Sequence, residues 1–292
     1  KFGFATIVGK PNVGKSSLVN SLTGRKTSIT SRRPQTTRNR IIGVVNRPTY
    51  QLAIIDTPGI HTSKHALNQR IDGIARDSIR GGDIVVMVID ARGWRREDQI
   101  VWDALKHYTQ TLFVVINKFD LLNDSSRVLP LIEKCRLMGD IDEIIPISVK
   151  TGHNLEILHE LLQNRLPVSS PGFSLDDPNV SQLESYLAEL IREQVFRLTG
   201  AEIPYRSAVV VEEKKHGVGS MPEYHADIWV ETTGQKAILI GRGGQRLKDI
   251  SMRARRQIEA LIGSRVVLLT RVIVRKRWSS NSTDLNRLGY HD

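Results

Sequence analysis

The chain has 292 residues and a formal net charge of +11, from 42 Lys and Arg against 31 Asp and Glu. At roughly 150 residues per domain this length favours two domains, and 40% hydrophobic with 25% charged residues excludes collagen-like, mucin-like and wholly disordered proteins. No apolar run approaches the roughly 20 residues of a membrane-spanning helix, and the single cysteine, Cys135, leaves no intrachain disulfide, which suits a reducing cytoplasm.

The first half of the chain alternates short apolar runs with amphipathic stretches. The runs are rich in β-branched residues, which predicts buried strands of a mostly parallel sheet; they span 4–9, 51–56, 84–90, 112–117 and 144–147. Helices are predicted between them at 16–22, 68–80, 97–108, 127–138 and 154–166. Because Asn46-Arg47-Pro48 is a turn signal, residues 41–45 are expected to pair with the second strand as a hairpin. This alternation predicts an α/β domain with helices on both faces of its sheet.

The first strand leads into a glycine-containing segment that fits the pattern G-x-x-x-x-G-K-[ST], with Ser17 following it into a helix. The segment is Gly9-Lys10-Pro11-Asn12-Val13-Gly14-Lys15-Ser16. Its glycines let backbone N–H groups turn toward phosphates, and the helix N-terminus adds a favourable dipole. We expect Lys15 to reach the β- and γ-phosphates and to act in catalysis, and the Ser16 hydroxyl to bind Mg²⁺. Residues 9–17 are thus predicted to bind a nucleotide.

Two polar segments are expected to complete the phosphate site. Asp56-Thr57-Pro58-Gly59 ends a strand, which places Asp56 to hold Mg²⁺ and the amide of Gly59 to contact a γ-phosphate. Upstream of it lies Gln35-Thr36-Thr37-Arg38, from which one threonine should contact Mg²⁺ and assist catalysis. Thr37 is preferred for this role, and Thr36 stays open.

A third motif, Asn117-Lys118-Phe119-Asp120, follows the strand at 112–117 and is typical of guanine recognition. The carboxylate of Asp120 accepts hydrogen bonds from the ring N1–H and the exocyclic amine, a donor pair that adenine lacks. A buried carboxylate left unpaired by the wrong base costs about 1–3 kcal/mol or more. The stem of Lys118 can stack along the base. Ser148-Val149-Lys150 matches the weaker S-A-K motif that contacts the guanine oxygen, with valine in place of the usual alanine.

These four motifs, in this order and each after a predicted strand, resemble the GTPase superfamily, which implies GTP and GDP as substrate and product. Ile60 stands where many small GTPases carry a glutamine that orients the attacking water, so intrinsic hydrolysis should be slow. His61 could replace that glutamine, although a solvated loop residue is its more ordinary role. Asn12 resembles the position that binds potassium in some GTPases without the glutamine, so K⁺ is a candidate second cofactor.

A segment rich in proline, glycine and serine separates the two halves, so we predict a nucleotide-binding domain at 1–167, a linker at 168–180 and a second domain at 181–292. The second domain is expected to be α+β, with an excursion around 216–222 between its first two strands. Its helices are predicted at 181–198 and 245–262, and its strands at 206–213, 224–232, 237–240 and 265–274.

The positive charge is concentrated in the second domain. Residues 236–278 contain 12 basic and 2 acidic side chains, whereas residues 181–235 contain 5 basic and 9 acidic ones. A G-x-x-G turn at 241–244 opens the basic helix, which is the K-homology mode of binding single-stranded nucleic acid. Trp229, Tyr224 and Trp278 are expected in the core or at an interface rather than stacked on bases. The residues predicted to contact RNA are Lys236, Ile240, Gly241, Arg242, Gly243, Gly244, Gln245, Arg246 and Lys248.

A GTPase domain joined through such a linker to a type II K-homology domain resembles the Era GTPases. Besides the motifs above, the resemblance rests on Gly-Ala-Glu-x-Pro-Tyr at 200–205, Ile-Gly-x-x-Gly at 240–244 and Leu-Gly-Tyr at 288–290. It covers nearly the whole chain. It implies a GTPase of small ribosomal subunit assembly that binds the 3′ end of small-subunit ribosomal RNA. It also implies a cytoplasmic protein, with peripheral association with the inner membrane in some members.

The hypothesis that follows is a nucleotide-switched RNA-binding protein. GTP and Mg²⁺ would order residues 35–38 and 56–61, change how the domains pack and expose the RNA groove. Two alternatives stay open: an RNA-binding protein whose nucleotide site is only structural, and a signalling GTPase at the membrane surface whose basic segment meets anionic lipid. An ATPase conflicts with Asp120.

Overall fold

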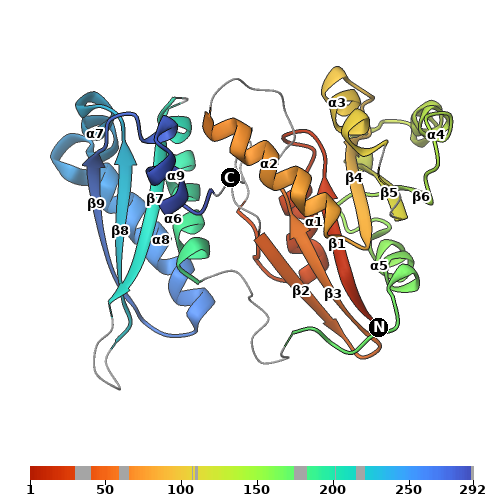
Figure 1. The fold of residues 1–292 in the computed structure, drawn as a ribbon, viewed down its shortest axis with the longest axis horizontal. Helices are drawn as coiled ribbons and strands as arrows, with labels where there is room; N and C mark the ends of the chain where they lie inside the picture. The colour runs from red at the N-terminus through yellow and green to blue at the C-terminus, as the bar shows by residue number, and fades with distance from the viewer. Residues whose placement is uncertain are drawn as a thin grey trace. The chain divides into compact units, whose positions relative to one another are not determined.

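Figure 1 shows a computed structural model of the chain, which describes residues 1–29, 41–58, 66–106, 108, 111–173, 183–200, 202–214 and 221–290. The chain forms two compact units that divide at residue 180. We call them the N-terminal unit and the C-terminal unit and describe each by itself. Of the predicted linker at 168–180, only the part up to residue 173 is described.

The N-terminal unit is built on one six-stranded sheet. Its strands lie in the order β2-β3-β1-β4-β5-β6, and every neighbouring pair is parallel except the β2–β3 hairpin. The predicted parallel sheet and the predicted hairpin are both confirmed. The strands are β1 (Phe2–Val8), β2 (Ile41–Arg47), β3 (Tyr50–Asp56), β4 (Ile84–Asp90), β5 (Thr111–Asn117) and β6 (Glu143–Pro146).

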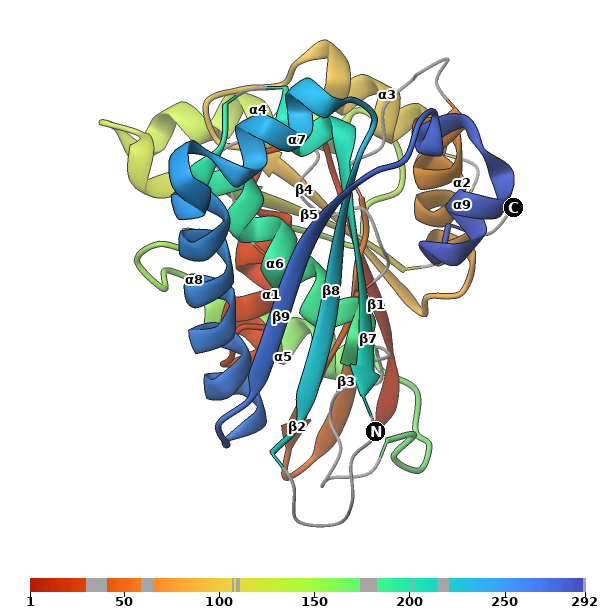
Figure 2. The same ribbon diagram turned by 90° about the vertical axis from the view of Figure 1, so that its left-hand side faces the viewer.

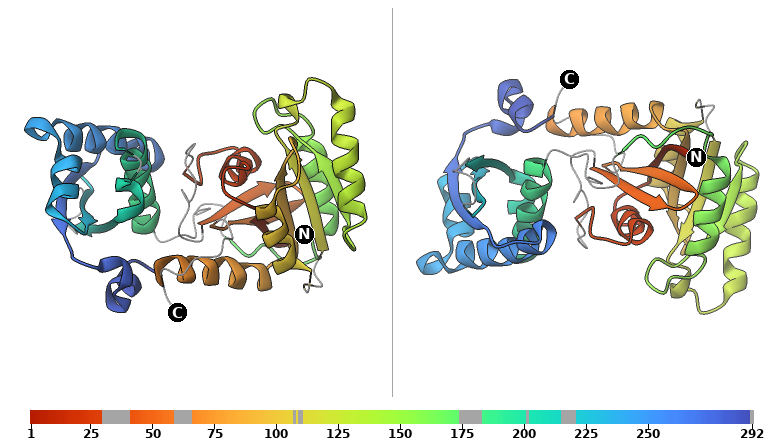
Figure 3. Two further views of the ribbon diagram at one scale, coloured as in Figure 1. Left: turned by 90° about the horizontal axis from the view of Figure 1, so that it is seen from above. Right: turned by 90° about the horizontal axis from the view of Figure 1, so that it is seen from below.

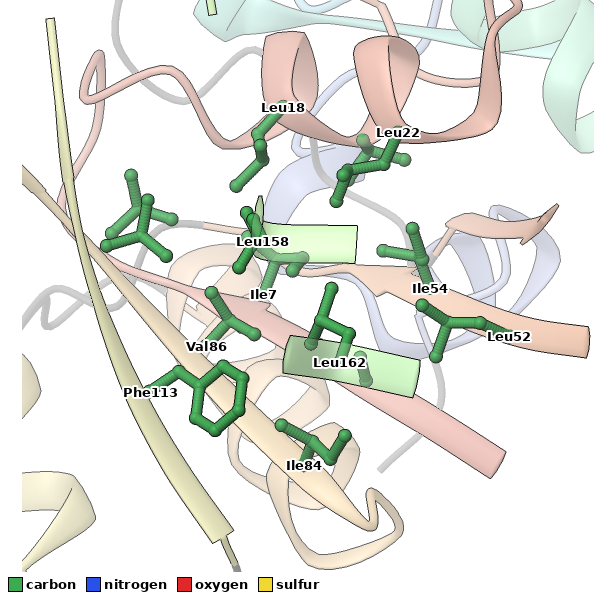
Figure 4. Close-up of a cluster of buried hydrophobic side chains, with 14 of the residues drawn as sticks. Ile7, Leu18, Leu22, Leu52, Ile54, Ile84, Val86, Phe113, Leu158 and Leu162 are labelled. Carbon is green, nitrogen blue, oxygen red and sulfur yellow. The ribbon is translucent and has the colours of Figure 1, made fainter. Parts of the chain in front are cut away.

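Helices cover both faces of this sheet (Figure 3), which explains why central strands such as β4 and β5 are apolar on both faces. On one face, leucines of α1 and α5 pack over alternate strand residues such as Ile7, Ile54 and Val86 (Figure 4). On the other face, α2, α3 and α4 pack over the residues between them, such as Val85 and Met87. The helices are α1 (Lys15–Thr23), α2 (Ala66–Arg80), α3 (Arg96–Leu105), α4 (Leu129–Arg136) and α5 (Leu155–Arg165).

The C-terminal unit has a three-stranded sheet in the order β7-β8-β9, with β7 and β8 antiparallel and β8 and β9 parallel. Figure 2 shows these strands side by side, with α6 behind them and α8 to the left of β9. Tyr224, Ala226, Ile228 and Val230 alternate along β8 and are all buried. The elements are α6 (Leu183–Leu198), β7 (Ser207–Lys214), β8 (Glu223–Val230), α7 (Thr233–Ile240), α8 (Gln245–Ile262), β9 (Val267–Val274) and α9 (Ser282–Arg287).

The strand predicted at 237–240 is wrong, because these residues form the second half of helix α7. The helix begins in a capping box. Oγ1 of Thr232 accepts a hydrogen bond from the backbone N–H of Gln235 at 3.2 Å, and the Gln235 side chain accepts one from the N–H of Thr232 at 3.1 Å. Gly241 ends the helix. The four apolar residues at 237–240 are compatible with either a strand or a buried helix, and the capping box at Thr232 favours the helix.

Candidate functional site

The turn between β1 and α1 forms the predicted phosphate-binding loop, and its shape depends on two glycines. Gly9 has φ +148°, and a Cβ atom there would lie less than 3.0 Å from the backbone oxygen of Val88. Gly14 has φ +103°, and a Cβ atom there would lie less than 3.0 Å from the Asn117 side chain. Both positions therefore require glycine. The resulting tight turn directly precedes α1, whose N-terminal N–H groups and dipole favour phosphate.

Lys15, the first residue of α1, is buried beneath this loop. Its Nζ donates hydrogen bonds to the backbone oxygens of Gly9 at 2.9 Å and Lys10 at 3.0 Å. Burial lowers the pKa of Lys15 to about 8, although the nearby negative charge of Asp56 opposes this shift. A buried ammonium group among glycines fits an anionic group such as a phosphate.

Asp56, at the carboxyl end of β3, lies beside this loop. It is fully buried and lies in register with Ile7 of β1, two residues before Gly9. The next residue is also fixed, because Oγ1 of Thr57 donates to the backbone oxygen of Ile7 at 2.7 Å. The sheet therefore brings Asp56 and Thr57 to the loop that contains Lys15 and Ser16. Gly59, Ile60, His61 and the segment 35–38 with Thr36 and Thr37 lie outside the described residues.

The predicted guanine-recognition loop follows β5 and is tied to the phosphate-binding loop. Nδ2 of Asn117 donates to the backbone oxygen of Val13 at 2.8 Å. Lys118 has φ +68°, and its Nζ donates to the backbone oxygen of Asn12 at 2.6 Å. Asn12 itself has φ +64° and an exposed side chain. These contacts hold the two loops in one fixed relation.

The loop after β6 completes the edge of the sheet. Oγ of Ser148 donates to a carboxylate oxygen of Asp120 at 2.6 Å, and Nζ of Lys150 lies 3.8 Å from the other oxygen. The amide of Val149 donates to Oδ1 of Asn117 at 3.2 Å. The side chain of Val149 packs against the core, which accounts for valine where alanine is usual. The structure thus brings together the four motifs from the ends of β1, β3, β5 and β6.

Sequence reasoning missed Asp90, which anchors the lysine of this loop. Asp90 ends β4 in register with Asn117. Its Oδ2 accepts from Nζ of Lys118 at 2.9 Å and from the Arg92 guanidinium at 2.7 Å. Burial would raise the pKa of Asp90, but the hydrogen bonds from Arg92 and Lys118 outweigh it and hold the pKa well below its usual range. An acidic residue at the carboxyl end of a predicted central strand was the available signal.

Asp98 is the second missed carboxylate. It is fully buried in the first turn of α3, and its Oδ2 lies 2.5 Å from Nζ of Lys10. The sequence gives no sign of this pair, because 88 positions separate the two residues.

The predicted RNA-contact residues surround the turn between α7 and α8. Gly241, Gly243 and Gly244 have φ of +73°, +56° and +77°, so the backbone turns there in a form that favours glycine. The Arg242, Gln245 and Lys248 side chains are exposed, and Lys236, Ile240 and Arg246 are half-buried. Arg246 donates to the backbone oxygen of Ile238 and so braces the end of α7.

Three aromatic residues of the C-terminal unit are not available for stacking on bases. Trp229, Tyr224 and Trp278 are buried. Their predicted core position is confirmed. The glycine turn and the basic side chains around it are the stronger candidates for nucleic-acid contact on this unit.

Family models match both units. A model described as 50S ribosome-binding GTPase matches residues 4–118, and a model described as KH domain matches residues 202–279. The predicted fold, a P-loop GTPase domain followed by a KH domain, is confirmed. In the part of the chain that the structure describes, no helix has the length and apolar character needed to cross a membrane.

Curated relatives match along the whole chain. GTPase Era of Stenotrophomonas maltophilia is 39% identical over 289 residues, which cover 99% of this chain and 97% of the relative. GTPase Era of Azotobacter vinelandii is 40% identical over 291 residues, with 99% and 97% covered.

Solved structures match as closely in three dimensions. A variant of Aquifex aeolicus Era bound to GDP and AlF₄⁻ has a TM-score of 0.94 at 37% identity, with 99% of each chain covered. Era in complex with MgGDPNP and nucleotides 1506–1542 of 16S ribosomal RNA has a TM-score of 0.94 at 38% identity, with the same coverage.

Proposed function

The chain belongs to the Era family of GTPases, and on that premise we propose that it hydrolyses GTP to GDP and phosphate and binds the 3′ end of small-subunit ribosomal RNA during assembly of the small ribosomal subunit. One observation carries the proposal. A phosphate loop and a guanine-recognition loop are held together at one sheet edge, in a chain that also presents a glycine turn opening a basic helix. We place this function in the cytoplasm, where ribosomal subunits are assembled.

Each motif has a distinct role at the nucleotide. The backbone N–H groups of residues 9–17 cradle the phosphates, and Lys15 neutralises charge on the β- and γ-phosphates. Among the described residues no three His, Cys, Asp or Glu side chains gather as a metal site. By the GTPase motifs, Mg²⁺ would be held by Ser16, Asp56, Thr37 or Thr36, and phosphate oxygens, and would neutralise developing charge. We assign the backbone amide of Gly59 a contact with the γ-phosphate.

Guanine is selected by the loops that the structure joins at Asn117. We assign the donor pair of the base to Asp120, whose carboxylate is held by the hydroxyl of Ser148, and the contact with the guanine oxygen to Ser148-Val149-Lys150. Lys118 covers one face of the ring and fixes the phosphate loop through Asn12.

Hydrolysis is slow without an activator, because Ile60 cannot orient water. We propose that K⁺ binds at Asn12. The side chain of Asn12 is exposed, and its backbone oxygen is fixed by a hydrogen bond from Lys118. A monovalent cation there supplies charge that an arginine finger supplies elsewhere.

The C-terminal unit supplies the RNA contacts. The backbone of Gly241 to Gly244 approaches phosphates, Ile240 borders the base groove, and Lys236, Arg242, Gln245, Arg246 and Lys248 add polar and cationic contacts. The domain limits we propose are 1–167 for the GTPase domain, 168–180 for the linker and 181–292 for the RNA-binding domain. GTP or GDP at the first domain then changes the RNA affinity of the second.

The test is GTP hydrolysis by the full chain, with and without a short single-stranded RNA from the 3′ end of small-subunit ribosomal RNA. We expect slow turnover that the RNA stimulates and that Lys15→Ala abolishes. Arg242→Glu should remove the stimulation, whereas Arg265→Glu, at the other end of the basic helix, should keep it. No turnover by the wild-type chain would overturn the proposal. Stimulation by anionic vesicles in place of RNA would instead support the membrane-surface alternative.

A further inference from the structure

A charged residue of the phosphate loop is held by a helix that belongs to none of the nucleotide motifs. Lys10 lies between the two glycines of the loop and is 9% exposed. Its Nζ lies 2.5 Å from Oδ2 of Asp98, whose side chain is 0% exposed. The ion pair therefore joins the loop after β1 to the first turn of α3.

Asp98 is itself rigidly placed. It is the third residue of α3, and its Oδ2 also accepts a hydrogen bond at 2.8 Å from the backbone N–H of Arg95, the residue that precedes the helix. Its Oδ1 has no hydrogen-bond partner among the residues that the structure describes. A buried carboxylate of this kind depends on a cation for compensation, and a buried ammonium group depends equally on the carboxylate.

The backbone of Lys10 faces the opposite way, into the nucleotide site. Its carbonyl oxygen accepts a hydrogen bond from Nζ of Lys15, the lysine assigned to the β- and γ-phosphates, at 3.0 Å. Lys10 thus contacts Lys15 through its backbone carbonyl and α3 through its side chain. The guanine-recognition loop holds the following part of the phosphate loop through the backbone oxygens of Asn12 and Val13. Asp98 holds the part of the phosphate loop at Lys10, which the contacts at Asn12 and Val13 do not reach.

We propose that Asp98 is a positioning residue of the nucleotide site: through its ion pair with Lys10 it fixes the first half of the phosphate loop in the form that binds phosphate. This inference rests on the proposed binding of guanine nucleotides. It assigns to α3 a role in nucleotide affinity that no motif of the sequence gives it.

The test is a set of variants of the full chain, Asp98→Asn, Lys10→Met and both together. Each is measured for its affinity for fluorescent GDP and for a fluorescent GTP analogue that cannot be hydrolysed, and for its thermal midpoint. Asparagine at 98 keeps an oxygen for the helix cap but removes the charge. We expect Asp98→Asn to weaken both affinities about tenfold, within the range of coupling energies between contacting groups, and to lower the thermal midpoint.

The double variant separates positioning from structural support. It leaves no uncompensated buried charge, so its thermal midpoint should return toward that of the wild type. Its nucleotide affinity should stay several-fold weak, because the tether is still missing. If the double variant binds GDP within twofold of the wild type, the pair only supports the fold and the inference is overturned. If the double variant does not fold, Lys10→Met decides by the same twofold criterion.

Two controls complete the set. Glu97→Gln removes an exposed charge from the same turn of α3 and should leave both affinities within twofold of the wild type. Lys10→Arg keeps a cation opposite Asp98 and should retain most of the affinity. A wild-type chain that binds no guanine nucleotide would refute the proposed function itself, whereas tight wild-type binding with unchanged affinity in the double variant refutes the role of Asp98 alone.

Discussion

Asp90, at the end of β4, accepts hydrogen bonds from two cationic side chains, Arg92 and Lys118, and so fixes the position of Lys118. Lys118 donates hydrogen bonds both to Asp90 and to the backbone oxygen of Asn12. Asp90 therefore acts on the phosphate loop indirectly, through Lys118. A flexible lysine would otherwise lose side-chain entropy on binding a nucleotide, and Asp90 restricts it beforehand. The base-recognition loop is therefore ordered before any nucleotide arrives.

Asp90→Asn should weaken GDP and GTP affinity by about 1–2 kcal/mol, because the amide leaves the Lys118 ammonium without a charged partner. Titration with fluorescent nucleotides measures this loss. Arg92→Gln is the matched control, since Arg92 bonds the same carboxylate from an exposed position and, among the described residues, makes no hydrogen bond to either loop. Equal losses in the two variants would contradict a specific role for the contact with Lys118.

Asp120→Asn should move the preference of the site from guanosine to xanthosine nucleotides. The amide donates to the oxygen that xanthine carries in place of the exocyclic amine of guanine, and it no longer accepts two hydrogen bonds. Competition of GTP and XTP for one fluorescent nucleotide gives the ratio of affinities directly. A variant that still prefers GTP would show that Asp120 does not read the base.

Among the helices, α7 owes its start to a capping box. Thr232→Ala removes the side-chain acceptor for the N–H of Gln235 and should destabilise the C-terminal unit by about 0.5–2 kcal/mol. Urea unfolding followed by tryptophan fluorescence measures the change, since Trp229 and Trp278 are buried in this unit. Thr233→Ala, one residue into the helix, should cost less. An equal effect at both positions would mean that the cap contributes nothing specific.

The hairpin and α5 are joined by a buried pair whose protonation bears on stability. The hydroxyl of Tyr50 and Nδ1 of His159 lie 2.9 Å apart, and both residues are buried. Burial, with a smaller contribution from Arg47, lowers the pKa of His159 in the folded chain, against an opposing effect of Glu156. The unfolded chain therefore binds more protons in this range, so the stability contributed by neutral His159 is lost as pH falls below about 6.5.

Unfolding in urea at pH 7.5 and pH 5.5 tests this contribution. The wild type should lose more stability on acidification than His159→Gln, by at most about 1.4 kcal/mol per unit of pKa shift. The informative quantity is the difference in stability loss between the wild type and His159→Gln, since other groups titrate equally in both proteins. An equal loss would show that His159 is not a source of the pH dependence.

Element by element, the sequence predicts strands better than it predicts the contacts between loops. Short runs rich in β-branched and aromatic residues favour buried strands, so β1, β4 and β5 were predictable within two residues. The segment 237–240 was not, because four apolar residues lack a period and the deciding cap lies upstream, at Thr232. The motif residues of the site were predictable from spacing. Asp90 could have been suspected from its place at the carboxyl end of a predicted strand, but Asp98 could not, because no local pattern indicates an ion pair between residues 88 positions apart.

For the whole molecule, the concentration of positive charge in residues 236–278 should make RNA binding depend strongly on salt. Lys248 is exposed near the glycine turn. If it contacts one phosphate, Lys248→Gln should lower the slope of log affinity against log salt by about 0.7. Arg271→Gln, on β9, is the control, because Arg271 is paired with Asp227. Unchanged slopes in both variants would remove Lys248 from the RNA contacts.

The order of the strands along the chain also determines when the contacts of the phosphate loop can form during translation. Val13 receives its hydrogen bond from Asn117, which is synthesised 104 residues later. At about 5–20 residues per second, roughly 5–20 s of translation pass before that bond can form. Throughout this interval the phosphate loop lacks its contacts with Asn117 and Lys118, and such long-range closure is slow to nucleate. A nascent chain halted before β5 should therefore hold no nucleotide, and occupancy of this site reports that translation has passed residue 118.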